Sequence, residues 1–299
     1  MNKQKSVLIT GSSTGIGQAT AIHLARCGYH VFASMRNPST GAGPLLQMAE
    51  KESLPLEVIP LDVTDPDSSA RAVETILEKV GKIDVLVNNA GISGGGPVEE
   101  LTDDVLRRTF ETNFFGAVRM MRLVIPAMRQ ARCGAIVNIS SVVARWITAG
   151  SAGYCASKVA LEAASEAAAQ ELRRFNISVM LIEPGYTMTP IFEKKTEGTE
   201  GTEGVVVPSD SPYAEFSDRA GRQTAELLPN GSPPELVAET IQHALEEKSP
   251  KFRYPVGEDA KRIIAGRQGI SDEDWIDSGR EMTLDDYADF FHNTFGLRI

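Results

Sequence analysis

The stretch GYCASK at residues 153–158 places a phenol and an ammonium on one predicted helix. Tyr154 and Lys158 are four residues apart, so both side chains lie on the same face of that helix. A free tyrosine has a pKa of about 10, which is too high for efficient proton exchange at neutral pH, and a nearby ammonium lowers it. The pair therefore predicts a proton donor or acceptor. The alternative is an ordinary amphipathic helix start, with Tyr154 packed and Lys158 solvated.

Cysteine and histidine offer less chemistry. Cys155 adjoins Tyr154 but lies on another face of the predicted helix, which favours a small packed thiol over a nucleophile. The chain has three cysteines and four histidines, without a CxxC motif or a histidine cluster. This pattern predicts a reducing compartment, no disulfide framework and no metal site.

A glycine cluster, TGSSTGIG, occupies residues 10–17, between an apolar run and a helical pattern. Gly11, Gly15 and Gly17 let the backbone turn tightly and approach a phosphate, and the N-terminus of the following helix supplies N–H donors. The cluster favours nucleotide binding. The alternative is a tight strand–helix turn without a ligand.

The elements that must position these residues are short apolar runs alternating with helical patterns. The apolar runs lack polar alternation, which is typical of strands buried on both faces of a parallel sheet, and strand–helix alternation indicates right-handed crossovers. We predict an α/β fold of about seven strands, a Rossmann-type doubly wound parallel sheet flanked by helices. The predicted strands are 6–10, 30–35, 56–63, 83–91, 134–140, 177–185 and 251–256, and the predicted helices are 16–28, 68–81, 102–130, 152–175, 211–228 and 233–247.

The whole chain, residues 1–299, is predicted to be a single domain with a core over about 5–190. A TEG repeat at 196–204 lacks apolar periodicity and indicates a mobile loop, within a helical substrate-loop or lid region over about 186–230. A helical C-terminal extension is expected over about 257–299.

Composition excludes several classes of function. Hydrophobic residues make up 42% of the chain and charged residues 23%, an ordinary globular balance. The net charge of −10 argues against nucleic acid as a partner, since phosphate binding needs clustered Lys and Arg. The sequence has no apolar run near the roughly 18 residues of a membrane span and no signal-peptide pattern. We therefore expect a cytoplasmic protein without a membrane span.

Four motifs in order, T-G-x-x-x-G-x-G, NNAG at 88–91, ISS ending at Ser141 and Y-x-x-x-K, together resemble the short-chain dehydrogenase/reductase family over roughly residues 5 to 190. The resemblance implies that Tyr154 donates or accepts the proton, and that Lys158 keeps it reactive and hydrogen-bonds the nicotinamide ribose. Ser141, rather than Ser140, matches the serine that bonds the substrate oxygen. Asn113 matches the residue that holds a water and the lysine in a proton relay; alternatively, it satisfies a helix kink.

The cofactor type is argued from the end of the second strand, which reads ASMRNP. An acid there would bond the ribose 2′-OH of NAD, whereas Arg36 can pair with a 2′-phosphate, unless it is simply a surface arginine. This favours NADP(H), with NAD(H) as the other possibility. By resemblance the other cofactor-binding positions are Gly11, Ser13, Gly15, Ile16 and Gly17, Asp62 and Val63 at the adenine, Asn89, Ala90 and Gly91, Tyr154 and Lys158, and Pro184, Gly185, Thr187 and Thr189 near the nicotinamide.

These features predict an NADP(H)-dependent oxidoreductase that interconverts a primary or secondary alcohol and a carbonyl. The PKFRYPVG stretch and the helical tail resemble the branch of 17β-hydroxysteroid and retinol dehydrogenases, which suggests steroid or retinoid substrates. The alternatives are a non-catalytic dinucleotide sensor, which the filled catalytic positions disfavour, an epimerase or dehydratase on the same fold, and a plain scaffold protein. The family often forms homodimers or homotetramers through its two long helices, here 102–130 and 152–175.

Overall fold

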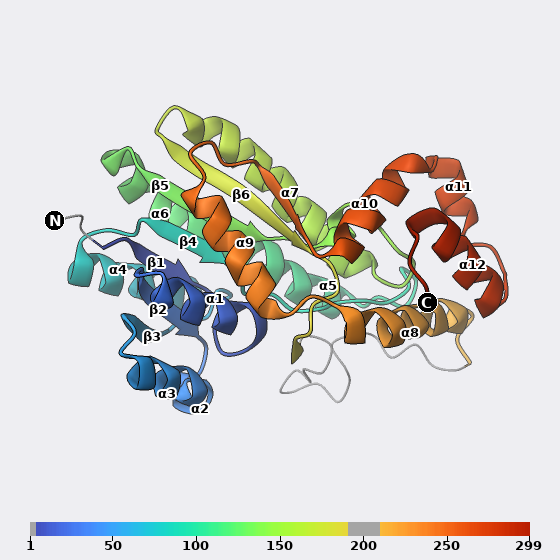
Figure 1. Cartoon of the computed structure of the whole chain (residues 1–299), viewed down its shortest axis with the longest axis horizontal. Helices are drawn as coiled ribbons and strands as arrows, with labels where there is room; N and C mark the ends of the chain where they lie inside the picture. Colours follow the sequence, from blue (N-terminus) through green and yellow to red (C-terminus); the bar gives the residue numbers. More distant parts are fainter. Residues whose placement is uncertain (1–3, 191–209) are drawn as a thin grey trace.

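A computed structural model describes residues 4–190 and 210–299. Within these residues the strands form one parallel sheet in the order β3-β2-β1-β4-β5-β6-β7 (Figure 1). The strands are β1 (Ser6–Ile9), β2 (His30–Met35), β3 (Leu56–Pro60), β4 (Val85–Asn88), β5 (Gly134–Ile139), β6 (Ile177–Pro184) and β7 (Arg253–Val256). The predicted doubly wound sheet of seven strands is confirmed. Its order reverses direction between β1 and β4, and ligands of such sheets bind at this switch point.

Helices cover both faces of the sheet. One face carries α1 (Gly15–Arg26), α3 (Gly43–Glu52) and α9 (Pro234–Glu246), and the other carries α4 (Pro66–Val80), α6 (Ala117–Ala131) and α7 (Ala152–Arg173). Along β1, Val7 and Ile9 enter the first core and Leu8 enters the second. This explains the uninterrupted apolar runs, because successive residues of a strand point to opposite faces and here both faces are buried.

The structure differs from the predicted helices in two places. The short helix α2 (Pro38–Gly41) and α3 were not predicted. The long helix expected at 102–130 is divided into α5 (Asp103–Phe110), a π-helical segment η1 (Glu111–Gly116) and α6. Single-turn π segments within helices are frequent at functional sites, and this one contains Asn113.

The C-terminal extension packs beside the end of β5. It comprises α10 (Glu258–Gly269), α11 (Asp272–Asp277) and α12 (Leu284–Phe295), which gather with α8 (Ala214–Leu227) at the end of the molecule opposite the N-terminus (Figure 1). Trp146 lies 5.9 Å from Phe291 and 5.8 Å from Phe295 between ring centres, in an aromatic cluster. The extension therefore supports the segment that follows Ser141. The predicted TEG repeat at 196–204 lies outside the described residues.

We expect Phe291→Ala to lower the free energy of unfolding by about 3–5 kcal/mol, because it opens a cavity where a fully buried ring now packs. Leu284→Ala on the same helix is the control: Leu284 is 37% exposed, so its loss should be below about 1 kcal/mol. Urea unfolding measures both. Equal losses would contradict the packing of α12 on Trp146.

None of the helices in the described part of the chain is long and apolar enough to cross a membrane.

Candidate active site

The loops that follow β1 and β4 are joined at the switch point of the sheet. The Thr10 hydroxyl accepts hydrogen bonds from the backbone N–H groups of Asn89 and Ala90, both at 3.0 Å. In return the Asn89 side-chain amide donates to the carbonyl oxygens of Thr10 at 2.9 Å and Gly11 at 3.0 Å. The predicted cofactor residues of these two loops therefore form one surface, although about 80 residues separate them in sequence.

The first of these loops is a cradle of bare backbone. Gly11 and Gly15 have φ of 69° and 60°, in the left-handed region that favours glycine. A Cβ at Gly17 would lie 2.3 Å from the Gly11 carbonyl oxygen, so a side chain cannot fit there. Ser13 and Ile16 belong to the same loop and the first turn of α1, which contains no acidic residue. The free N–H groups of that turn suit a pyrophosphate, so these residues fit a dinucleotide.

The predicted catalytic residues come together at the carboxyl end of β5. Ser141 follows the strand and opens the turn η2 (Val142–Ala144), where its hydroxyl accepts from the Val143 N–H at 3.3 Å. The Ser141 hydroxyl also acts on the Tyr154 phenol, whose pKa it lowers. The Lys158 ammonium lies 5.7 Å from the centre of the Tyr154 ring and donates to the Ile139 carbonyl oxygen at 2.9 Å. A phenol, a hydroxyl and an ammonium thus meet at one point.

Burial controls the charges at this point. Desolvation raises the pKa of Tyr154 to about 12, while the hydrogen bond from Ser141 lowers it and Cys155 raises it further. Desolvation also lowers the pKa of Lys158 to about 8, against the opposing charge of Glu162. The expected lowering of the Tyr154 pKa is therefore wrong for the protein alone, because desolvation is the largest effect on this phenol and raises its pKa. At neutral pH the pair is a protonated phenol beside a largely charged ammonium.

Asn113 is tied to the loop after β4. Its side-chain nitrogen donates to the Ile92 carbonyl oxygen at 2.9 Å and to the Ser157 hydroxyl at 3.0 Å, and its side-chain oxygen accepts from the Ile92 N–H at 2.9 Å. A Cβ at Gly91 would lie 3.4 Å from Asn113 Oδ1 and 3.6 Å from Lys158 Nζ. Asn113 and Lys158 therefore border the same glycine without a direct hydrogen bond. The amide thus joins the π-helical segment to the loop after β4 and to α7, and the proton relay stays a prediction.

The predicted adenine end lies along β2 and β3. Arg36 is exposed directly after β2, and none of the residues at 4–190 and 210–299 forms a salt bridge with it. The Asp62 carboxylate accepts from the Thr64 N–H at 2.9 Å and the Thr64 hydroxyl at 2.8 Å, which shapes the loop after β3. Val63 is buried beside it. Arg36 is thus accessible to a ligand, whereas the Asp62 carboxylate already accepts hydrogen bonds within the loop after β3.

The loop after β6 returns to the glycine cradle. Pro184 ends the strand, and a Cβ at Gly185 would lie 2.2 Å from the Asp259 carboxylate. Thr187 is buried and donates to the Gly185 carbonyl oxygen at 3.2 Å. The Thr189 Cβ lies 3.2 Å from the place of a Gly15 Cβ. Of these predicted residues, Thr189 lies against the glycine cradle, whereas the Thr187 side chain bonds within the loop after β6.

Cys155 is buried, and desolvation raises the pKa of its thiol, so the predicted packed thiol is confirmed. In the described ranges, three or more His, Cys, Asp or Glu side chains never gather into a possible metal site.

A charged cluster behind Lys158 was not predicted. Glu162 and Glu183 are 5% and 1% exposed, and Arg253 donates to both carboxylates. A signal for both acids was present in the sequence: Glu162 lies one turn after Lys158 on a small apolar helix, and Glu183 interrupts the apolar strand ISVMLIEP. Neither signal indicates a partner 91 or 70 residues away.

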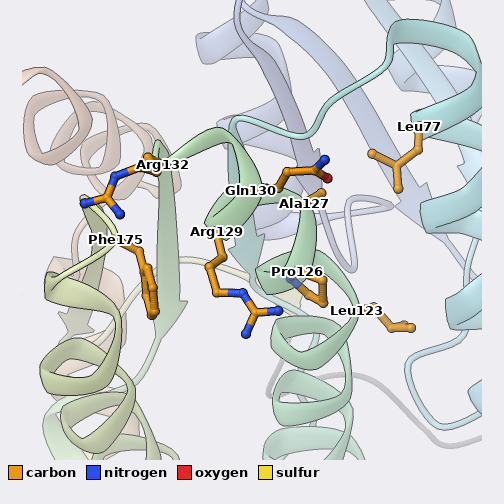
Figure 2. A pocket seen from close by; sticks show the side chains of 8 residues that line it. All are labelled: Leu77, Leu123, Pro126, Ala127, Arg129, Gln130, Arg132 and Phe175. Atoms are coloured by element: carbon orange, nitrogen blue, oxygen red, sulfur yellow. The ribbon is translucent and has the colours of Figure 1, made fainter.

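A separate groove of about 730 Å³ lies at the opposite edge of the sheet (Figure 2). Its walls include Arg132 and Phe175, which shortly precede β5 and β6. Because Ser141 and Lys158 belong to the carboxyl edge, this groove is not part of the candidate active site.

Comparison with known proteins agrees with this geometry. Residues 5–200 match the family model described as short chain dehydrogenase. The chain is 34% identical over 251 residues to a 3-ketodihydrosphingosine reductase of Bacteroides thetaiotaomicron, covering 84% of this chain and 87% of that protein. It is 37% identical over 255 residues to retinol dehydrogenase 8 of Bos taurus, covering 83% and 80%. The crystal structure of a short-chain dehydrogenase from Streptomyces avermitilis is similar with a TM-score of 0.77 and 32% identity, covering 90% and 94%.

Proposed function

The chain belongs to the short-chain dehydrogenase/reductase family of oxidoreductases with an NAD(P)-binding Rossmann fold, and from that premise we propose that it is an NADP(H)-dependent enzyme interconverting an alcohol and a carbonyl. The observation that carries this proposal is the meeting of three groups after β5. The Ser141 hydroxyl lowers the pKa of the Tyr154 phenol, and the Lys158 ammonium lies 5.7 Å from the centre of the Tyr154 ring.

In this proposal the bound nicotinamide supplies or accepts the hydride. For reduction, Tyr154 gives its proton to the carbonyl oxygen while the Ser141 hydroxyl donates a second hydrogen bond to that oxygen. A phenol with a pKa of about 12 holds the proton that this step requires. Lys158 then stabilises the phenolate that remains. Alcohol oxidation uses the same groups in reverse.

Lys158 can act on both the phenol and the cofactor. An ammonium has three N–H donors, and the Ile139 carbonyl oxygen takes one of them. The other two are available for the ribose hydroxyls of a dinucleotide whose pyrophosphate lies at the Gly11–Gly17 loop. Asn113 would complete the site through the proton relay that the family resemblance implies.

We propose that Arg36 selects NADP(H) over NAD(H). Its exposed guanidinium, without a salt-bridge partner among the described residues, is available for a 2′-phosphate at the end of β2. The remaining predicted cofactor residues lie along the same edge of the sheet, from the end of β3 to the end of β6.

We expect Arg36→Ala to raise the KM for NADP(H) by roughly 10- to 150-fold, equivalent to about 1.5–3 kcal/mol for a charge-assisted phosphate contact. The KM for NAD(H) should change little. Arg71→Ala, which removes another exposed arginine, controls for the general loss of positive charge. Equal losses for the two cofactors in Arg36→Ala would contradict this assignment.

A panel of alcohols and carbonyls tests the reaction itself, with nicotinamide absorbance as the readout. The relatives' names motivate two lipid members of the panel, a retinol–retinal pair and 3-ketodihydrosphingosine, beside steroids and short-chain compounds. Turnover that requires Tyr154 supports the enzyme. Tight NADPH binding without turnover on the whole panel would favour the dinucleotide sensor.

Several expectations from the sequence stay predictions. These are the single domain with a substrate loop over about 186–230, the cytoplasmic location, and the homodimer or homotetramer. Phe115 on η1 and Val159 on α7 expose 49% and 41% of their surfaces, which supports association through these helices.

A further inference from the structure

The charged cluster behind Lys158 consists of Arg145, Glu162, Glu183 and Arg253. Arg253 Nη1 donates to Glu162 and, at 2.7 Å, to Glu183 Oε1, and Arg145 Nη1 lies 3.6 Å from the same Glu183 oxygen. Two carboxylates and two guanidinium groups thus balance in charge. The cluster links α7, β6 and β7 to the segment that follows Ser141.

Stability alone is a weak reason for such a cluster. Removing charges from water costs several kcal/mol per ion, and buried ion pairs replaced by apolar residues often leave a protein equally stable or more stable. Glu162 and Glu183 are nonetheless almost fully buried, at 5% and 1% exposure. A role in the neighbouring site would account for this arrangement.

Glu162 reaches the site by two routes. The Ser140 hydroxyl donates to Glu162 Oε1 at 2.6 Å, and Ser140 directly precedes Ser141. Lys158 lies one turn before Glu162 on α7 and donates to the carbonyl oxygen of Ile139, which directly precedes Ser140. Ile139 and Ser140 are therefore each held by a side chain of the same helix.

We propose that Glu162 is a positioning residue: its carboxylate keeps Lys158 charged and fixes the turn that presents Ser141, while Arg253 holds Glu162 in place. This inference rests on the proposed function, in which Lys158 stabilises the Tyr154 phenolate and binds the ribose.

The surroundings of Lys158 leave Glu162 as the opposing charge. Tyr154 and Glu162 face it from α7, the Ile139 carbonyl oxygen faces it from β5, and Asn113 approaches across Gly91. Behind Glu162 lie the other three members of the cluster. Burial lowers the pKa of Lys158 to about 8 and Glu162 raises it, so neutralising this acid must lower that pKa further. Lys158 would then lose its proton, and its charge, at a lower pH.

Glu162→Gln tests the charge, because the amide has nearly the same shape and its oxygen can still accept from Ser140. The NADPH dissociation constant is measured against pH by fluorescence, and kcat/KM is measured over the same range. In the parent protein, NADPH binding should weaken and kcat/KM should fall as the pH rises above the pKa of Lys158. Lys158→Met should lack this break in the pH profiles. In Glu162→Gln we expect the break in both profiles to move to lower pH by about one unit.

Two matched variants separate the routes. Ser140→Ala removes the hydrogen bond and keeps the charge, so kcat should fall by roughly 2- to 12-fold without a shift of the break. Glu166 lies on the same helix as Glu162, and its carboxylate is 3.7 Å from Arg253, but its side chain is 60% exposed. Glu166→Gln therefore removes a charge near Arg253 that is in contact with solvent. It should keep the parent's break and rate.

An unmoved break in a folded Glu162→Gln protein would overturn the inference and leave Glu162 a merely structural residue. Should that variant fail to fold, Glu162→Gln/Arg253→Met, which removes both charges of the pair, is measured in the same way and judged by the same criterion. The parent protein shows separately whether the proposed function fails. If the parent does not turn over any substrate, but Glu162→Gln still shifts the break in its NADPH-binding profile, the proposed reaction is refuted and the role of Glu162 stands. A parent without any Lys158-dependent break would overturn both.

Discussion

Tyr154→Phe should lower kcat by about 10²–10⁴ while NADP(H) binding stays nearly unchanged. The substitution deletes one hydroxyl and keeps the ring, so the packing beside Lys158 survives. What is lost is the group that holds the exchangeable proton, and the neighbouring Ser141 hydroxyl cannot replace it, because a serine is a far weaker acid than a phenol.

Single-turnover hydride transfer measures this loss, and a fluorescence titration of NADPH measures binding. Tyr254→Phe is the matched control, since it removes another phenol whose hydroxyl bonds to Glu247 and the Lys251 N–H, outside the site. Its rate of hydride transfer should equal that of the parent. A Tyr154→Phe protein with near-parent turnover would show that another group exchanges the proton.

Lys158→Met should lower kcat by at least as much and should also weaken NADP(H) binding by roughly 10-fold or more, because one charged donor serves both the phenol and the ribose. The variant also leaves the Ile139 carbonyl oxygen without its buried donor, at a cost of about 1–3 kcal/mol in the free energy of unfolding. A thermal melt therefore accompanies the kinetics.

The contrast between these two variants is the informative result. Lys261→Met, which removes an exposed lysine, controls for net charge and should change neither rate nor affinity. Lys158→Met with parent affinity for NADPH would mean that the lysine serves the phenol alone. In a dinucleotide sensor, Tyr154→Phe would change nothing that can be measured beyond binding.

Much of the site could be predicted because its residues follow local rules. Gly11, Gly15 and Gly17 stand between a strand and a helix, and Tyr154 and Lys158 are one turn apart, so their arrangement depends on short-range geometry. Uninterrupted apolar runs indicated a parallel sheet, and parallel strands bring their carboxyl ends to a common edge. Ser141 and Asn89 could thereby be placed near the cradle before any contact was known.

The unpredicted parts depend on distant segments. The π-helical turn at 111–116 occurs where the Asn113 amide bonds to Ile92, which lies in another loop. The aromatic cluster on Trp146 brings in α12 from the C-terminal end of the chain. Neither the π-helical turn nor the aromatic cluster produces a periodicity or a residue spacing that can be recognised within a short stretch of the sequence.

By itself, then, the sequence determined the fold class, the cradle and the residues that meet after β5. Only the tertiary structure decided how these groups are charged and held. It desolvates the Tyr154 hydroxyl, and this desolvation raises the pKa of the phenol to about 12. It also places Arg253 on Glu162, so that a buried acid lies behind the lysine. Desolvation and charge pairing depend on which distant segments come into contact, and that contact exists only once the sheet and its two layers of helices have assembled.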